Sequence, residues 1–96
     1  MSAETLFTLQ PTSQYRKDRK RLKKQGFPME LLDDVLQTLI EGRQLAPVHN
    51  DHMLSGNYAG HRECHVKPDW LLIYIKDQEK LILTATRTGS HSDLLE

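Results

Sequence analysis

Cysteine is almost missing from this chain of 96 residues: Cys64 is the only one, so no disulfide can form within one molecule. No apolar run approaches the roughly 18 residues that a membrane-spanning helix needs, and no signal peptide is recognisable. Gly/Ser linkers, internal repeats and low-complexity tracts are also missing. These absences predict one soluble domain over residues 1–96, in a reducing compartment, most simply the cytoplasm, with no membrane partner.

The net charge is zero, but the charges are unevenly distributed. Seven of the 13 lysines and arginines lie between Arg16 and Lys24, where Asp18 is the only acid. The next segment is acidic, with Glu30, Asp33, Asp34 and Glu41. Such asymmetry favours a polyanionic partner on one side, although a run like Arg16–Lys24 is equally typical of a solvated helical face.

The stretch HRECHVKPDWLLIY, residues 61–74, is the organising part of the chain. Residues 71–75 are continuously apolar and predict a strand buried on both faces, and residues 62–66 alternate and predict its neighbour. Between them, Pro68 fixes its own φ and keeps Lys67 out of the helical region, so residues 67–70 predict a tight connection.

The remaining elements follow from periodicity and end signals. A strand is expected over Thr5–Gln10, and a helix that Thr12 or Ser13 caps should run to about Gln25, with Tyr15 and Leu22 inside. A second helix, Met29–Glu41, carries its apolar residues at helical spacing. These are Leu32, Val35, Leu36, Leu39 and Ile40.

The second half of the chain predicts loops and strands. Residues 43–58 lack a sustained period and predict a loop, with Met53 and Leu54 near the sheet. A hairpin at residues 77–80 leads to a strand over Leu81–Thr86, and the tail should turn at Gly89 into a short helix capped by Ser90. The order β-α-α-β-β-β predicts an α+β domain, with two helices on one face of a small, largely antiparallel sheet.

Residues with reactive side chains flank the predicted strands: His52, His65, Asp69, Arg87 and His91, with Trp70 beside them. Each alone has a plainer interpretation, since a histidine is commonly structural, Asp69 suits a turn and Trp70 suits a core. Together they can cleave RNA without a metal. One group takes the 2′-hydroxyl proton, a second protonates the leaving 5′-oxygen, and a cation stabilises the phosphorane. Trp70 could stack on a base.

Four motifs together cover nearly the whole chain. They are Tyr15-x-Lys17-Asp18, Asp51-His52-x-Leu54-x-Gly56, Gly60-x-Arg62-x-x-His65-Val66-x-Pro68-Asp69-Trp70-x-Leu72-Ile73-Tyr74 and Arg87-Thr88-Gly89-x-His91-x-x-Leu94. These motifs closely resemble the YafQ branch of the RelE/ParE-like toxins. The resemblance implies the RelE-like fold and a ribosome-dependent mRNA endoribonuclease with no cofactor. It also implies a DinJ-like antitoxin as partner, besides the 70S ribosome and mRNA, with operator DNA bound only through the antitoxin complex.

The resemblance places the family's functional positions on His52, His65, Asp69, Arg87 and His91. We expect His91 to be the general acid, Asp69 or His65 the base, His52 an assisting group and Arg87 the phosphorane stabiliser. The family often has an aromatic residue near the C-terminus, where this chain has Leu95, so a stacking role there is in doubt. Substrate phosphates are expected to contact basic side chains: Arg16, Lys17, Arg19, Lys20 and Lys67.

Three other interpretations remain. His49, His52, His61 and His65, with Cys64, are spaced like metal ligands. Cys64 and His65 are neighbours on a predicted strand and so point to opposite faces, whereas a structural zinc needs four converging ligands. A ParE-like relative would act on DNA gyrase without the acid/base residues. A pure binding module would act with its antitoxin as a co-repressor, which is compatible with a toxin role.

Overall fold

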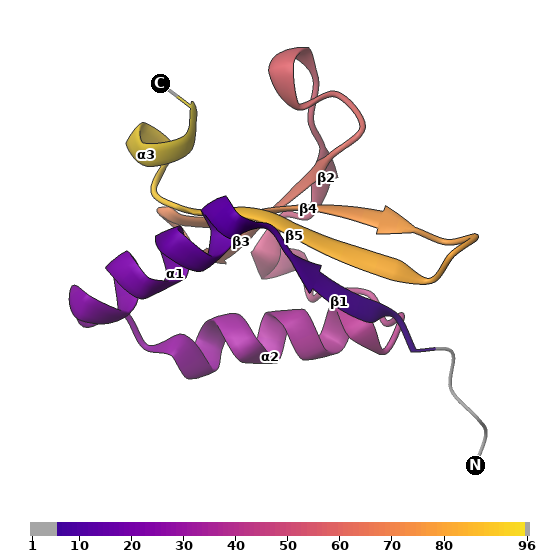
Figure 1. Ribbon diagram of the computed structural model, residues 1–96, viewed down its shortest axis with the longest axis horizontal. Coiled ribbons are helices and arrows are strands. Elements are labelled where there is room, and N and C mark those ends of the chain that lie inside the picture. The colour runs from indigo at the N-terminus through magenta and orange to yellow at the C-terminus, as the bar shows by residue number, and fades with distance from the viewer. Residues whose placement is uncertain (1–5, 96) are drawn as a thin grey trace.

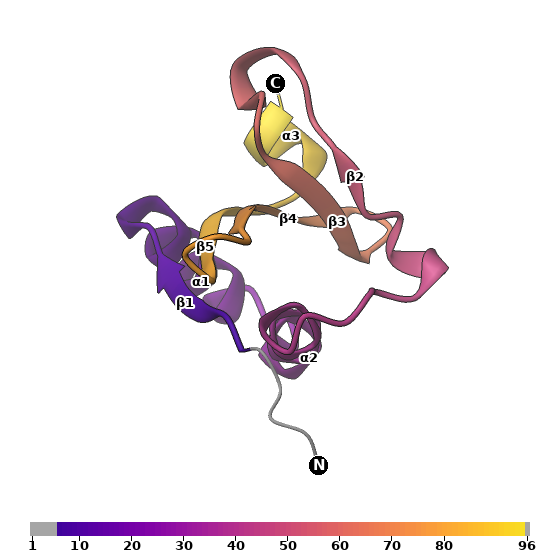
Figure 2. The same ribbon diagram turned by 90° about the vertical axis from the view of Figure 1, so that its right-hand side faces the viewer.

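The computed structural model describes residues 6–95, and within them a five-stranded sheet separates two layers. Helices α1 and α2 cover one face, and α3 and the loop after β2 rise from the other (Figures 1 and 2). In chain order the elements are β1 (Thr8–Pro11), α1 (Ser13–Lys24), α2 (Met29–Ile40), the 3-10 turn η1 (Pro47–His49), β2 (His52–Met53), the 3-10 turn η2 (Gly56–Tyr58), β3 (Arg62–Lys67), β4 (Trp70–Asp77), β5 (Ile82–Gly89) and α3 (His91–Leu95).

The strand order is β1-β5-β4-β3-β2, with β1 parallel to β5 and the other pairs antiparallel. The expected α+β order and the largely antiparallel sheet are therefore confirmed. The loop predicted over residues 43–58 contains one strand that was missed, β2, which pairs His52 with Glu63 and Met53 with Arg62. Two residues are too short a strand to show a period, so only the partner strand reveals it. The expected position of Met53 and Leu54 near the sheet is confirmed.

Strand β4 lies at the centre of the sheet, and its apolar run contributes to both faces. Leu72 and Tyr74 join the main core under α1 and α2, while Leu71 and Ile73 form a smaller cluster with Leu94 of α3. This two-sided burial is why residues 71–75 read as continuously apolar instead of alternating.

Helix α1 begins at Ser13, as predicted, because the Thr12 hydroxyl accepts the Tyr15 N–H at 3.0 Å. The same hydroxyl donates to the Thr86 carbonyl at 2.7 Å, which ties the start of α1 to β5. The inner face holds the expected Tyr15 and Leu22, but also Asp18, whose side chain is fully buried. The expected burial of Tyr15 and Leu22 is therefore confirmed, and the burial of Asp18 was not foreseen.

The ends of two strands differ from the predictions, and one predicted helix cap is confirmed. Strand β1 extends to Pro11, and the predicted start at Thr5 lies outside the described residues. Strand β5 runs on to Gly89, so Arg87 and Thr88 are strand residues and not part of a tail. The predicted cap of α3 is confirmed: Ser90 Oγ accepts the Asp93 N–H, and Asp93 Oδ2 accepts the Ser90 N–H, both at 3.1 Å.

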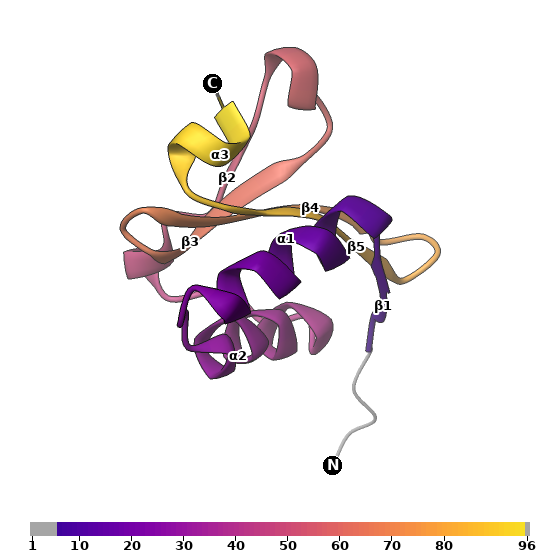
Figure 3. The same ribbon diagram turned by 60° about the vertical axis from the view of Figure 1, so that its left-hand side comes forward.

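Figure 3 shows α1 and α2 together under the sheet, with α3 on the opposite side. Among residues 6–95, no helix is long and apolar enough to cross a membrane.

Candidate active site

Three histidines from three separate elements lie in a row on the face of the sheet opposite α1 and α2. The ring centroids of His52 and His65 are 6.4 Å apart, and those of His65 and His91 are 5.8 Å apart. Strand pairing explains why His52 and His65 are close. His52 of β2 lies opposite Glu63 of β3, and His65 comes two residues after Glu63 and therefore points to the same face. Helix α3 then brings His91 over the strand.

Asp69 stands beside His91 and orients it. One carboxylate oxygen, Oδ1, lies 3.1 Å from His91 Nδ1 and accepts the His91 backbone N–H at 3.2 Å. The side-chain hydrogen bond from His91, then the backbone one, lowers the pKa of Asp69 below its ordinary value. An ionised Asp69 accepts a hydrogen bond that the Nδ1–H of His91 donates, which leaves His91 Nε2 to exchange protons with a substrate.

Glu63 lies beside the histidine row, and the sequence analysis did not indicate it. Its side chain is only 4% exposed, and its Oε1 lies 3.2 Å from His52 Nε2 and 3.7 Å from His65 Nε2. Its other oxygen, Oε2, has no hydrogen-bond partner among the described residues. The available signal was its spacing from His65, because residues i and i+2 of a strand share a face.

The other nitrogen of each strand histidine faces a carbonyl. His52 Nδ1 lies 2.7 Å from the Asn50 carbonyl, and His65 Nδ1 lies 3.2 Å from the Pro68 carbonyl. Since a carbonyl only accepts, we assign the Nδ1–H tautomer to both rings. In the neutral ring of His65 the lone pair is then on Nε2, where it can act as a base.

Arg87 reaches the histidine face because of an irregularity in β5. Ala85 lies opposite Tyr74 and Arg87 opposite Ile73, so Thr86 is an extra residue that reverses the alternation. The guanidinium is not free: its Nε donates to Asp18 Oδ2 at 2.7 Å and its Nη2 to Asp18 Oδ1 at 3.1 Å. These bonds raise the pKa of Arg87, so its side chain keeps a positive charge that is held in place by Asp18.

Trp70 does not belong to the site, and the expectation that it stacks on a base was wrong. Its side chain is buried in the core on the helix side, at right angles to Phe27 with ring centroids 5.0 Å apart. Its indole Nε1 donates to Thr88 Oγ1 at 2.9 Å. The plainer interpretation of Trp70 as a core residue is the correct one, because strand neighbours alternate between faces.

The basic side chains divide into two groups. Arg16, Lys17, Lys20 and Lys67 are exposed. Arg19 instead makes a 2.8 Å ion pair with Asp33 of α2 and donates to the Tyr15 hydroxyl at 3.3 Å. The expectation that Arg19 binds substrate is therefore not supported, since its guanidinium already joins two helices.

The metal-like spacing that includes Cys64 does not form a site. Cys64 is fully buried on the helix side, where burial raises the pKa of its thiol, while His65 points to the other face. A different set does converge: one ligand atom from each of Glu63, His65 and His91 lies within 4.8 Å of the others.

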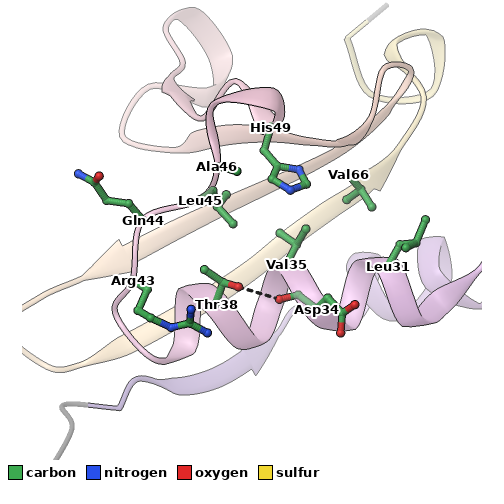
Figure 4. A pocket seen from close by; sticks show the side chains of 10 residues that line it. All are labelled: Leu31, Asp34, Val35, Thr38, Arg43, Gln44, Leu45, Ala46, His49 and Val66. Atoms are coloured by element: carbon green, nitrogen blue, oxygen red, sulfur yellow. Dashed lines mark hydrogen bonds between the residues drawn. The ribbon is translucent and has the colours of Figure 1, made fainter.

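The histidine row is reached by solvent, since the side chains of His52, His65 and His91 are 41%, 19% and 51% exposed. A hollow of about 460 Å³ occurs elsewhere, between α2, the loop after it and β3 (Figure 4). Only His49 among the histidines lines it, and His49 Nδ1 lies 2.6 Å from the His65 carbonyl behind the site. Small-molecule sites are usually enclosed, so an open row of imidazoles suits a polymeric substrate better.

Comparisons with known proteins show which family this chain belongs to. The family model described as "Bacterial toxin of type II toxin-antitoxin system, YafQ" matches residues 7–96. The mRNA interferase toxin YafQ of Escherichia coli K12 is 42% identical over 84 residues, which cover 86% of this chain and 89% of that protein.

Solved structures give the same result. A metal-bound toxin from Helicobacter pylori superposes with a TM-score of 0.88 at 40% identity, covering 94% of this chain and 100% of that one. The E. coli DinJ-YafQ toxin-antitoxin complex superposes with a TM-score of 0.86 at 35% identity, covering 95% and 99%. The expected RelE-like fold is thereby confirmed, and this chain belongs to the YafQ family of bacterial type II toxin–antitoxin toxins.

Proposed function

We propose that this chain is the toxin of a type II toxin–antitoxin system and cleaves translated mRNA as an endoribonuclease. The observation that carries the proposal is the row of His52, His65 and His91 with Asp69 bound to His91. The name of its E. coli relative, mRNA interferase toxin, supports the same reaction. A gyrase-directed toxin without acid/base residues would not need this row.

The reaction needs no metal. His65 Nε2 takes the proton of the 2′-hydroxyl, whose oxygen attacks the adjacent phosphorus. His91 Nε2 gives a proton to the departing 5′-oxygen, so the products are a 2′,3′-cyclic phosphate and a 5′-hydroxyl end. Arg87 stabilises the charge on the phosphorane, and His52 with Glu63 assists His65. Asp69 is already bound to His91, so we assign the base role to His65 and the orienting role to Asp69.

The partners follow from the relatives and the surface. The E. coli relative was solved with the DinJ antitoxin, and we propose a DinJ-like antitoxin for this chain, acidic where it covers α1. The complex would bind operator DNA through the antitoxin. We place the toxin in the cytoplasm, where ribosomes and mRNA meet, with the exposed Arg16, Lys17, Lys20 and Lys67 contacting phosphates.

The test is induced expression with and without a DinJ-like antitoxin, reading growth and mRNA 5′ ends together. Wild type should arrest growth and give new 5′ ends within translated frames, and antitoxin should abolish both. His91→Ala should lower the cleavage rate about 10²–10⁴-fold, the usual contribution of one positioned acid. His61→Ala, a histidine outside the row, is the matched control. Full arrest and cleavage by His91→Ala would remove His91 from the mechanism.

A second activity, binding of a transition metal, is favoured by one observation. Glu63, His65 and His91 present ligand atoms within 4.8 Å of one another, and imidazoles and carboxylates suit zinc and copper. The H. pylori relative is described as metal-bound. We propose that a bound metal would block the acid and base and so inhibit cleavage. Titration with zinc or copper should show 1:1 binding that Glu63→Gln weakens, and no heat of binding would exclude the site.

A further inference from the structure

The buried carboxylate of Asp18 connects the middle of α1 to β5, the strand that carries Arg87. Asp18 has no exposed surface and accepts five hydrogen bonds. The donors are Gln14 Nε2 at 3.2 Å, Arg21 Nη1 at 3.1 Å, Arg87 Nε at 2.7 Å, Arg87 Nη2 at 3.1 Å and the Thr88 N–H at 3.2 Å. The bond from the Thr88 N–H takes the place of a hydrogen bond to a neighbouring strand, because β1 stops opposite Ala85 and β5 continues beyond it.

The charge state of Asp18 is fixed by these donors. Burial raises the pKa of its carboxyl, but the hydrogen bonds from Arg87, Thr88, Gln14 and Arg21 outweigh burial, and the pKa lies below its ordinary value. Asp18 is therefore an anion that holds the Arg87 guanidinium by two parallel bonds, a geometry that fixes the orientation of the guanidinium as well as its position.

The connection continues to α3 through Arg21. The second amino group of Arg21, Nη2, lies 3.3 Å from Asp93 Oδ2, which also accepts the Ser90 N–H. His91 is the next residue. Gly89 makes room for this approach, since a Cβ there would lie 3.0 Å from Asp93 Oδ2 and 3.2 Å from Arg21 Nη2.

We propose that Asp18 and Arg21 are positioning residues for RNA cleavage: Asp18 orients the guanidinium of Arg87, and the bridge from Arg21 to Asp93 fixes the turn that presents His91. The chain Arg87–Asp18–Arg21–Asp93 alternates in charge, so each member is held by its neighbours. The proposal rests on the proposed function, because the cation and the acid that it positions are those of the nuclease reaction.

Chemical rescue separates positioning from simple stability. Arg87→Ala should lose cleavage, and added guanidinium at low millimolar concentration should restore part of it while Asp18 can hold the ion. The double variant Arg87→Ala/Asp18→Asn should not be restored. Asp18→Asn alone should lower kcat about tenfold to hundredfold with KM for the RNA within about twofold, as expected for a misplaced catalytic group. Asp34→Asn, an exposed acid on α2, is the matched control.

Arg21→Gln provides a second test that leaves the pair between Arg87 and Asp18 in place. Cleavage should fall by a smaller factor, and the NMR signals of the His91 ring and of the α3 amides should shift and exchange faster with solvent. Equal rescue of both Arg87 variants, or a folded Asp18→Asn with wild-type kcat, would overturn the role of Asp18. If the NMR signals of His91 are unchanged in Arg21→Gln, the positioning role of Arg21 is overturned. If wild type itself does not cut RNA, the proposed function fails, whereas the NMR comparison still decides the positioning of His91.

Discussion

At the scale of single residues, the site works because each reactive ring has one nitrogen tied to a fixed oxygen. His65 Nδ1 faces the Pro68 carbonyl and His91 Nδ1 faces Asp69, so both rings direct Nε2 away from their anchors. A ring held in one tautomer has a defined acid or base function before substrate arrives, which lowers the reorganisation needed in the transition state.

The pair of Asp69 and His91 allows a direct measurement. Because the side-chain hydrogen bond of His91 is the main cause of the lowered pKa of Asp69, His91→Ala should move that pKa up toward the ordinary 3.8. The backbone bond remains, so the return should be incomplete. Titration of the Asp69 carboxyl carbon by NMR checks this, with His61→Ala as control. An unchanged midpoint in His91→Ala would show that the two side chains do not interact in solution.

Asp18 gives a prediction for stability against pH. Its folded pKa is lowered, so its contribution is present above the ordinary value of 3.8 and is lost as the pH falls through the folded pKa. At pH 7 we expect Asp18→Asn to lose about 3–5 kcal/mol of unfolding free energy, because Arg87 then loses its buried partner. Urea unfolding of both proteins, at pH 7 and at a pH well below 3.8, measures the difference in unfolding free energy.

The difference between wild type and Asp18→Asn should shrink in acid, while Asp34→Asn should follow wild type throughout. A loss in Asp18→Asn that is as large in acid as at neutral pH would mean that packing, and not charge, makes Asp18 important.

Residue types could be predicted from the sequence better than their directions. His52, His65, Asp69 and His91 are conspicuous because imidazoles and a carboxylate flank predicted strands. The direction of Arg87 depends on the bulge at Thr86, and no local pattern marks a bulge of one residue. An acid inside a basic helix looks solvated, so the burial of Asp18 could not be foreseen without the strand that packs on it.

At the scale of elements, the two central strands and both long helices could be predicted because each carries a clear local signal. The signal is a continuous apolar run in β4, alternation in β3, a capping residue in α1 and helical spacing of apolar residues in α2. Strand β2 could not be predicted, since two residues carry no such signal, and the predicted strand over Leu81–Thr86 ends too early because Arg87 and Thr88 are polar. Their polarity is explained by α1, which covers the end of β5 and supplies Asp18 as an acceptor. The elements that carry the chemistry are thus the ones whose sequence departs from the expected pattern.

The contact between Gly89 and α3 yields a prediction at this scale. Gly89→Ala places a methyl group 3.0 Å from Asp93 Oδ2 and 3.1 Å from Asp93 Cβ, so the Asp93 side chain must give way by a few tenths of an ångström, which disturbs its bonds to the Ser90 N–H and to Arg21. We expect cleavage to fall by up to about tenfold, since misplacement of a catalytic group by about 1 Å can cost a hundredfold. Cleavage assays and hydrogen exchange of the α3 amides measure the effect.

Gly26→Ala is the matched control for this substitution. Gly26 has a φ of +89° at the end of α1, and a Cβ added there would meet nothing within 4 Å. The substitution should therefore cost about 1 kcal/mol of unfolding free energy through backbone strain and leave cleavage unchanged. If both alanine variants cleave equally well, the close packing of α3 has no part in presenting His91.

At the scale of the whole molecule, the sheet separates stability from chemistry. The large core with α1 and α2 lies on one side, and the histidine row stands on the other beside a small cluster of Leu71, Ile73 and Leu94. Helix α1 belongs to both sides, because its buried face packs under the sheet while Asp18 and Arg21 reach β5 and α3. Although the net charge is zero, the exposed side chains of Arg16, Lys17 and Lys20 give α1 a cationic flank.

That flank predicts how binding responds to salt. Each phosphate contact on single-stranded RNA adds about 0.7 to the slope of log affinity against log salt. Lys17→Gln/Lys20→Gln removes two exposed cations and should lower the slope by about 1.4, whereas Arg19→Gln, whose guanidinium is bound to Asp33, should leave it nearly unchanged. Fluorescence anisotropy with labelled RNA measures both slopes, in a His91→Ala background that slows cleavage during the measurement. If Arg19→Gln lowers the slope as much as the lysine pair does, the ion pair with Asp33 opens on binding, and the cationic surface is larger than the free molecule shows.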